Sequence, residues 1–126
     1  VRYASERKQF GKPIIEHQSV ANMLADCRAE TFAARAMVLE VASRFSHPPS
    51  PEVAVDIACA KYFASEMVCR VADRAVQVLG GQGYLASHCI ERLYRDVRLF
   101  RLFEGTSQMQ QMVIARAMVR EAKKSS

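Results

Sequence analysis

The sequence predicts an all-α protein, and three observations support this fold class. Half of the 126 residues are apolar, which is enough for a sizeable core. Good helix formers are abundant, whereas the chain has only five glycines, four prolines and no tryptophan. Long segments repeat apolar residues at the three- and four-residue steps of a helix face. Because one domain is the default for this length, we expect a single helical domain over residues 1–126.

The first predicted element is the end of a helix over residues 1–10, which Gly11 and Pro13 terminate. The start is charged, has no apolar core of a signal peptide and begins within a helical pattern. We therefore expect it to continue from an upstream segment.

The second element is a long helix from about Ser19 to Phe45. Its apolar stripe predicts packing against partner helices at a shallow angle. The residues of this stripe are Val20, Leu24, Cys27, Thr31, Ala34, Val38, Val41 and Phe45.

The third element is a second long helix that begins after "SHPPSPE" and continues to about Leu79. Ser50 is the expected N-cap, Pro51 suits the first helical position, and Glu52 suits the positive end of the helix dipole. Gly80 or Gly81 is expected to take a left-handed conformation at the end. The apolar stripe comprises Ile57, Ala60, Ala64, Met67, Val71, Ala75 and Val78.

Two shorter helices complete the prediction. One spans about Ile90 to Phe100, with Ile90, Leu93, Val97 and Phe100 facing inward and Arg92, Arg95 and Arg98 on another face. For the other, Ser107 is the expected N-cap, and Gln110 completes a capping box. Met109, Met112, Val113 and Met118 form its apolar side. No segment has strand periodicity. The helices predict an antiparallel up-and-down four-helix bundle whose first helix is truncated at residues 1–10.

Charge and cysteine content narrow the classes of function. The net charge is +5, but the 18 basic residues are scattered among 13 acidic ones, which favours solvated helix faces. "RLYRDVRLFR" is the one basic concentration, and nucleic-acid binding there is disfavoured because Asp96 and large apolar residues interrupt it. The four cysteines form no C-x-x-C pair, which predicts reduced, core-like thiols in a cytosolic or matrix setting. The three histidines lie far apart, so no metal site is predicted; no apolar run reaches the length of a membrane span.

Glu104 in "FRLFEGTSQMQQ" is the first candidate for chemistry. From spacing alone, the favoured interpretation is a solvated residue before a capping glycine, without a chemical role. A carboxylate beside Leu102 and Phe103 would have its charged form disfavoured, which makes a glutamate usable as a base near neutral pH. Gly105 leaves the backbone open to a substrate, and the free N–H groups of the next helix favour an anion or carbonyl.

Two further segments are candidates for cofactor binding. "QVLGGQGY" is not a dinucleotide fingerprint because it follows a helix, so it is either a helix stop or a bare backbone for a diphosphate or ring. In "ERKQFGK", Arg7, Lys8 and Lys12 are either a solvated helix end or phosphate ligands.

Six segments, in this order and spacing, carry a family resemblance: "YASERKQFGKPIIEHQ", "MLAD", "AKYFASE", "AVQVLGGQGY", "RLYRDVR" and "FEGTSQMQQMVIAR". Together they resemble the C-terminal helical domain of the acyl-CoA dehydrogenases over essentially the whole chain. The resemblance implies a longer flavoprotein with FAD, a middle β domain and an N-terminal helical domain. It implies a homodimer or homotetramer that oxidises an acyl-CoA to the trans-2-enoyl-CoA and passes electrons to electron-transferring flavoprotein. The implied location is the bacterial cytoplasm or the mitochondrial matrix.

The resemblance also implies residue roles. Glu104 is the general base that takes the C2 proton while the C3 hydride passes to flavin N5, and Gly105 lines the thioester site. Thr106 and Gln108 match FAD contacts that follow the base. The other implied FAD contacts are Arg7, Gln9, His17 and Gln18 near the diphosphate, and Gln77, Gly80 and Gly81 near the cofactor of a neighbouring subunit. The active site is then shared across a dimer.

The chain departs from the family pattern at Phe103, where many relatives have tyrosine. Glu104 itself argues against the isovaleryl and long-chain branches, which place the base on another helix. The β domain and N-terminal domain are outside this chain, so we expect it to be inactive alone. Acyl chain length and branching depend on residues outside it.

A non-enzymatic interpretation is kept beside this one. In it, the chain is a helical oligomerisation or docking domain whose basic helix, Arg92 to Arg101, meets an acidic partner.

Overall fold

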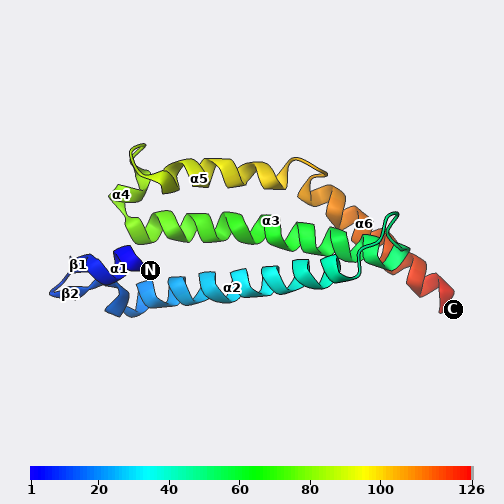
Figure 1. The fold of residues 1–126 in the computed structure, drawn as a ribbon, viewed down its shortest axis with the longest axis horizontal. Helices are drawn as coiled ribbons and strands as arrows, with labels where there is room; N and C mark the ends of the chain where they lie inside the picture. The colour runs from blue at the N-terminus through cyan, green and yellow to red at the C-terminus, as the bar shows by residue number, and fades with distance from the viewer. Residues whose placement is uncertain (126) are drawn as a thin grey trace.

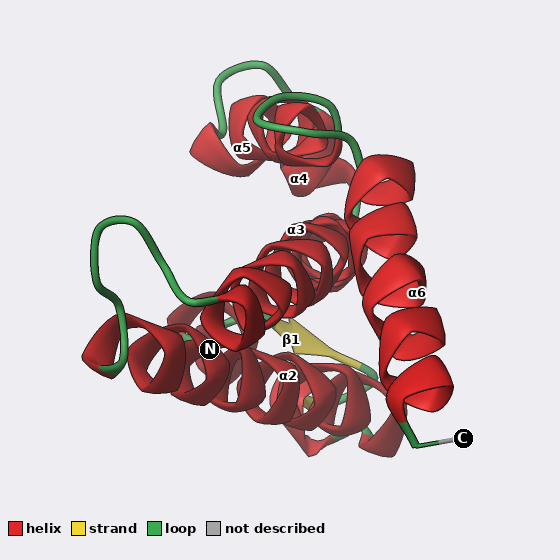
Figure 2. Cartoon of the chain, turned by 90° about the vertical axis from the view of Figure 1, so that its right-hand side faces the viewer, coloured by secondary structure: helices red, strands yellow, loops and turns green. Residues whose placement is uncertain are grey.

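A computed structural model describes residues 1–125 and confirms the all-α fold class. The long helices α2 (Gln18–Ser43) and α3 (Pro51–Leu79) lie side by side and antiparallel (Figure 1). Helix α5 (Cys89–Val97) lies along the opposite side of α3, and α6 (Ser107–Lys124) packs on a third side (Figure 2). Helix α3 is therefore the central element, because α2, α5 and α6 all pack against it.

The first part of the chain corrects the prediction of a helix over residues 1–10. Its elements are α1 (Arg2–Glu6), β1 (Lys8–Gln9), β2 (Lys12–Pro13) and the 3₁₀ helix η1 (Ile14–Glu16). The two strands form an antiparallel hairpin, with Gln9 opposite Lys12, so the expectation of no strand was also wrong. Phe10 and Gly11 make the turn with φ of 53° and 82°. Positive φ at both central residues suits a two-residue hairpin turn, which ends the helix before Gly11 is reached.

The ends of α3 follow the local sequence signals. Ser50 Oγ accepts a hydrogen bond from the backbone N of Val53 at 3.3 Å, and Pro51 occupies the first turn, as predicted. Gly80 ends the helix with φ 58° and ψ −140°. The positive φ was expected, but this ψ lies outside the left-handed helical region, which makes the position still more dependent on glycine.

The buried core is small and rich in alanine. No large side chain among residues 1–125 is fully buried. Ala60 and Met67 of the predicted α3 stripe are buried, whereas in α2 only Ala34 is buried. Because α3 has neighbours on three sides, it also buries residues outside that stripe. The buried apolar residues are Ala4, Ala34, Val53, Ala58, Ala60, Met67 and Ala72.

Beyond α3, the short α4 (Gly81–Tyr84) was not predicted. The helix expected over 90–100 is divided into α5 and the 3₁₀ helix η2 (Arg98–Arg101). Leu93 and Phe100 were expected to face inward, but both are exposed.

The predicted apolar side of α6 also lies open. Its residues are exposed by between 40 % (Val113) and 64 % (Met118). Further exposed large side chains lie on α2, including Phe32 and Leu39. Exposed apolar helix faces are usually covered in the working form of a protein when their side chains form a large patch.

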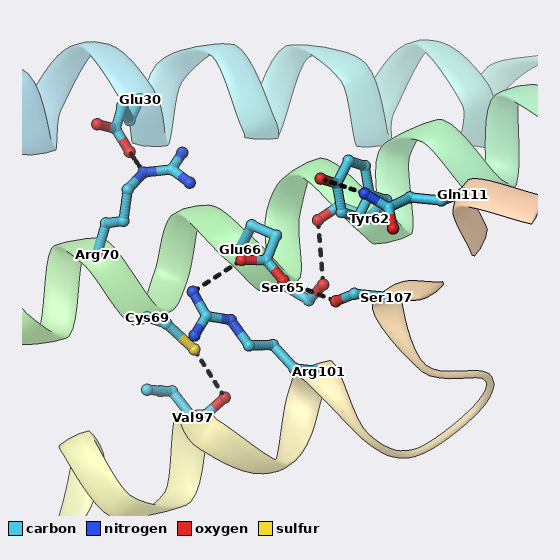
Figure 3. A network of polar contacts seen from close by, with 10 residues as sticks. All are labelled: Glu30, Tyr62, Ser65, Glu66, Cys69, Arg70, Val97, Arg101, Ser107 and Gln111. Carbon is cyan, nitrogen blue, oxygen red and sulfur yellow. Dashed lines mark hydrogen bonds and ion pairs between the residues drawn. The ribbon is translucent and has the colours of Figure 1, made fainter. Parts of the chain in front are cut away.

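Glu30 on α2 joins that helix to α3. Its carboxylate accepts hydrogen bonds from Arg70 at 2.9 Å and Arg74 at 2.8 Å; Figure 3 shows the first of these. Burial raises the pKa of the Glu30 carboxyl, but the hydrogen bonds and charges of the two arginines outweigh it and lower the pKa below the ordinary value. Glu30 and the two arginines therefore join the middle of α2 to the C-terminal third of α3.

The cysteines are all free thiols in the described chain. Cys27, Cys59 and Cys69 are half-buried, while Cys89 is exposed, so the core-like placement was wrong for Cys89. No helix within residues 1–125 is long and apolar enough to span a membrane.

Candidate functional site

The loop between η2 and α6 has two consecutive residues with positive φ. Glu104 has φ 54° and Gly105 has φ 87°. Positive φ is uncommon for a residue other than glycine and persists where surrounding contacts impose it. Glu104 is exposed, and within residues 1–125 its carboxylate has no hydrogen-bond or ion-pair partner. The carboxylate is thus available to a ligand while its backbone is held in a strained conformation.

Two side chains with nitrogen donors, the Lys61 ammonium and the Gln110 amide, hold the main chain of this loop. Lys61 Nζ on α3 donates to the carbonyl oxygen of Gly105 at 2.6 Å and to that of Phe100 at 2.9 Å. Gln110 Nε2 donates to the carbonyl oxygens of Glu104 at 3.2 Å and Gly105 at 3.4 Å. The carbonyls of the 104–105 and 105–106 peptides are therefore both engaged by protein donors.

Gln110 in this position corrects the predicted capping box. The N-cap of α6 is Thr106, whose Oγ1 accepts from the backbone N of Met109 at 3.2 Å. Ser107, which was expected to be the cap, is 4 % exposed and donates to Glu66 Oε1 at 2.7 Å (Figure 3). A hydrogen bond to a carboxylate is stronger than a hydrogen bond between neutral groups. The Ser107 hydroxyl therefore bonds to Glu66, and Thr106 is the N-cap.

Glu66 ties together the two ends of the same loop. Its other oxygen, Oε2, pairs with Arg101 Nη2 at 2.8 Å, at the end of η2 (Figure 3). Arg101 thus precedes the loop and Ser107 follows it, and one carboxylate on α3 contacts both. Arg101 Nε is buried without a partner in the described chain.

A side chain is disfavoured at Gly105. A Cβ built there would lie 2.6 Å from Gln110 Nε2, and φ of +87° disfavours any residue with a side chain. The glycine predicted to line a thioester site is therefore required by the loop itself. Gln108 is exposed on the first turn of α6.

A second group of predicted residues lines one cavity at the opposite end of α3. The cavity has a volume of about 580 Å³ and lies between the hairpin, the start of α2 and the end of α3. The predicted residues that line it are Arg7, Gln9, His17, Gln77, Gly80 and Gly81. Two stretches far apart in the sequence, 7–17 and 77–81, thus meet here, which residue spacing alone did not establish. Gln18 is exposed and is not among the lining residues.

The hairpin side of this cavity is organised around His17. A ring nitrogen, Nε2, lies 3.1 Å from the carbonyl oxygen of Gln9, and the ring packs edge-on against Phe10 at 5.9 Å. Phe10 is 93 % exposed, and Tyr3 also lines the cavity, with its hydroxyl 3.5 Å from the Leu79 carbonyl. The sequence analysis gave neither aromatic residue a role, although both lie within the "YASERKQFGKPIIEHQ" segment.

The glycine side of the cavity offers bare backbone. A Cβ added at Gly81 would meet no atom within 4 Å, so the space beside it is open. Arg7 is exposed and contributes a guanidinium, the group suited to phosphate oxygens. A cation beside accessible glycine backbone is an arrangement that fits a diphosphate.

The two groups of residues do not form one site within a single chain. Lys61, which holds the Glu104 loop, and Gln77 are sixteen residues apart on α3. At a rise of about 1.5 Å per residue, they are separated by about 24 Å along the helix. Glu104, Gly105, Thr106 and Gln108 therefore lie at one place, and the six cavity residues lie at another.

Two other expectations bear on the site. The basic face of α5 is partly neutralised, because Arg95 pairs with Glu91 at 2.6 Å and Arg92 lies 4.0 Å from Asp96. In the part of the chain that the structure describes, no three His, Cys, Asp or Glu side chains are grouped as metal ligands.

Comparison with known proteins identifies the family to which this chain belongs. The family model described as "Acyl-CoA dehydrogenase, C-terminal domain" matches residues 1–119. The chain therefore belongs to the acyl-CoA dehydrogenase family.

Individual relatives agree with this assignment. Probable acyl-CoA dehydrogenase YngJ of Bacillus subtilis is 43 % identical over 118 residues, which cover 94 % of this chain and 30 % of the relative. The caffeyl-CoA reductase-Etf complex subunit CarC of Acetobacterium woodii is 43 % identical over 115 residues, covering 91 % of this chain and 30 % of the relative. Butyryl-CoA dehydrogenase of Megasphaera elsdenii superposes with a TM-score of 0.88 at 36 % identity, over 94 % of this chain and 30 % of that chain. The chain spans less than a third of the length of each.

Proposed function

We propose that this chain is the C-terminal domain of a longer, FAD-dependent acyl-CoA dehydrogenase that oxidises an acyl-CoA thioester to the trans-2-enoyl-CoA. One observation carries the proposal. Glu104 has an unpaired carboxylate on a backbone held at positive φ, directly before a glycine that leaves the main chain accessible. Relatives named as acyl-CoA dehydrogenases support the reaction class.

In this proposal, Glu104 removes the C2 proton of the thioester. A carboxylate without a competing cation is free to accept a proton, and a positioned general base contributes about 10²- to 10⁴-fold in rate. Gly105 leaves room for the thioester beside the base. Leu102 and Phe103, which precede the base, are 51 % and 41 % exposed. Exposed apolar side chains of this size are often buried by another part of the protein. We expect the remainder of the longer protein to cover the loop and exclude water from Glu104.

The residues of the 580 Å³ cavity fit FAD at its diphosphate. Arg7 would pair with phosphate oxygens, and the backbone at Gly80 and Gly81 would lie against the cofactor, with Gln9, His17, Gln18 and Gln77 as polar neighbours. Thr106 and Gln108 would contact FAD near the base. FAD, when bound, supplies the acceptor for the C3 hydride.

The separation of about 24 Å between the two groups supports a shared active site. The residues near Glu104 would serve the FAD of their own subunit, and the cavity residues would serve the FAD of a neighbour. We therefore propose a homodimer or homotetramer, with electrons leaving through electron-transferring flavoprotein. The relative named as a subunit of a reductase-Etf complex supports this kind of partner.

The test uses the longer protein loaded with FAD and compares Glu104→Gln with the parent. Flavin bleaching after rapid mixing with a series of acyl-CoA thioesters reports the chemical step. We expect the rate to fall about 10²- to 10⁴-fold with FAD still bound. Glu121→Gln, an exposed glutamate on α6, is the matched control and should reduce at the parent rate. Unchanged bleaching of Glu104→Gln by every accepted thioester would remove Glu104 from this role.

The alternative function is a non-catalytic oligomerisation or docking domain. The exposed apolar side of α6, from Met109 to Val119, favours it. Light scattering with and without FAD separates the two functions. Self-association without any uptake of flavin by the longer protein would support the alternative.

A further inference from the structure

One short stretch of α3 determines where the Glu104 loop lies. Lys61 contacts the carbonyls of Phe100 and Gly105, and Glu66 contacts the side chains of Arg101 and Ser107. These contacts join residues 35 to 44 positions apart in the sequence, so they depend on the packing of α3 against η2 and α6. From this arrangement we propose that Lys61 is a positioning residue for the base, a role that rests on the function proposed for Glu104.

The geometry of Lys61 suits this role. Its ammonium is a single point with three donors, so it draws two carbonyls toward one position. The carbonyls of Phe100 and Gly105 enclose the four residues of the loop that end at Glu104. Hydrogen bonds from a charged donor are about twice as strong as those between neutral groups. The stem of Lys61 lines an apolar groove between α2 and α3, beside Val41 and Ile57, which limits its freedom.

The backbone conformation shows why such contacts are needed. Glu104 at φ 54° is strained, and a strained residue persists only when its surroundings determine it. Lys61 engages the carbonyl of Gly105, the residue after Glu104, from the α3 side, and Gln110 engages the carbonyls of both Glu104 and Gly105 from α6. Without the Lys61 contacts, the loop would keep its contacts to Glu66 and Gln110 but lose the charged donor that joins the Phe100 and Gly105 carbonyls to α3.

Loss of the Lys61 contacts should slow catalysis because it would let the Glu104 carboxylate move away from its reacting position. Displacement of a reacting group by about 1 Å can cost about 10²-fold in rate, even when the change is remote from the chemistry. We expect Lys61→Met, which keeps the stem and removes the ammonium, to slow flavin reduction by about 10- to 100-fold. Lys61 contacts neither Thr106 and Gln108 nor the residues of the cavity, which are the proposed FAD ligands. The amount of FAD bound per subunit should therefore stay near the parent value.

The experiment measures single-turnover flavin reduction by an acyl-CoA in the FAD-loaded longer protein. The variants are Lys61→Met, Lys61→Arg and the control Tyr62→Phe. Tyr62 also joins α3 to α6, through a hydrogen bond from Gln111 at 2.9 Å, but does not touch the loop (Figure 3). Tyr62→Phe should reduce flavin at the parent rate. Lys61→Arg restores a cationic donor and should recover part of the rate.

A double variant separates positioning from general weakening of the fold. If Lys61 acts through the base, Lys61→Met should slow reduction in the parent but have little further effect in a Glu104→Gln background. Equal slowing in both backgrounds, or slowing by Tyr62→Phe as large as by Lys61→Met, would overturn the proposal. Should Lys61→Met fail to fold, Lys61→Gln, which keeps one polar donor group, takes its place under the same criteria.

Failure of this proposal and failure of the proposed function give different results. If Glu104→Gln abolishes reduction while Lys61→Met reduces at the parent rate, Lys61 has no positioning role and the function stands. If Glu104→Gln reduces at the parent rate, Glu104 is not the base, and the role of Lys61 fails with it.

Discussion

Substitution of Gly105 by alanine tests the loop geometry directly. The position combines a φ of +87° with a Cβ that would lie 2.6 Å from Gln110 Nε2. Gly81 is a matched control, because a Cβ there would meet open space and its φ is not in the positive range. Both glycines are exposed, so the two variants differ in backbone conformation and steric contact and not in burial.

The expected cost of Gly105→Ala has two parts. Holding an L-residue other than glycine in a left-handed conformation costs about 1–2 kcal/mol. The new Cβ also displaces the Gln110 amide from its two carbonyl acceptors, and each such hydrogen bond is worth about 0.5–1.5 kcal/mol. Because these bonds are long and exposed, the lower end applies, and the free energy of unfolding should fall by about 2–3 kcal/mol in total.

Urea unfolding followed by circular dichroism measures this difference. Gly81→Ala should be neutral or stabilise by a few tenths of a kcal/mol to about 1 kcal/mol, since it reduces the entropy of the unfolded chain. The midpoint for Gly105→Ala should therefore lie clearly below that for Gly81→Ala, with the m-value unchanged. Equal midpoints for the two variants would refute the loop conformation on which the site is built.

Two further predictions concern the lowered pKa of the Glu30 carboxyl and the raised pKa of the Cys59 thiol. The Glu30 pKa is lowered in the folded chain, so the stability it contributes is present above the ordinary value of 4.5 and is lost as the pH falls through the lower folded value. Acid unfolding of Glu30→Gln should therefore lose less stability below about pH 4.5 than the parent or Glu121→Gln, and parallel curves would contradict this. Burial, with a smaller contribution from the charge of Asp56, raises the pKa of the Cys59 thiol, whereas Cys89 is exposed. Mass spectrometry after iodoacetamide treatment at pH 7.5 should find Cys89 labelled well before Cys59, and the reverse order would be inconsistent with their placement.

Local signals were sufficient for the long helices. Ser50, Pro51 and Gly80 fixed the ends of α3 because capping and chain reversal depend on neighbouring residues alone. The hairpin was missed because Phe10 takes a positive φ, which bulky side chains rarely adopt, so the helical pattern before it dominated the prediction.

Contacts between distant residues account for the errors at the site. Thr106 and Ser107 are both good N-caps, and the choice between them is made by Glu66, 41 residues from Ser107. Lys61 was visible in "AKYFASE", but its two carbonyl partners depend on how η2 and α6 pack on α3. The exposed faces of α5 and α6 have the same explanation. An apolar stripe predicts that a helix face is covered, but it does not identify the element or partner that covers it.

The most direct measurement of the central claim is hydrogen exchange at C2 of a bound thioester. An acyl-CoA with hydrogens on C2 but none on C3 can lose and regain a C2 proton without being oxidised. Incubated in D₂O with the FAD-loaded longer protein, it should acquire deuterium at C2, as detected by mass spectrometry, with the parent and with Glu121→Gln. With Glu104→Gln, we predict exchange slower by about 10²-fold or more. Exchange by Glu104→Gln at the parent rate would contradict the claim that Glu104 removes the C2 proton.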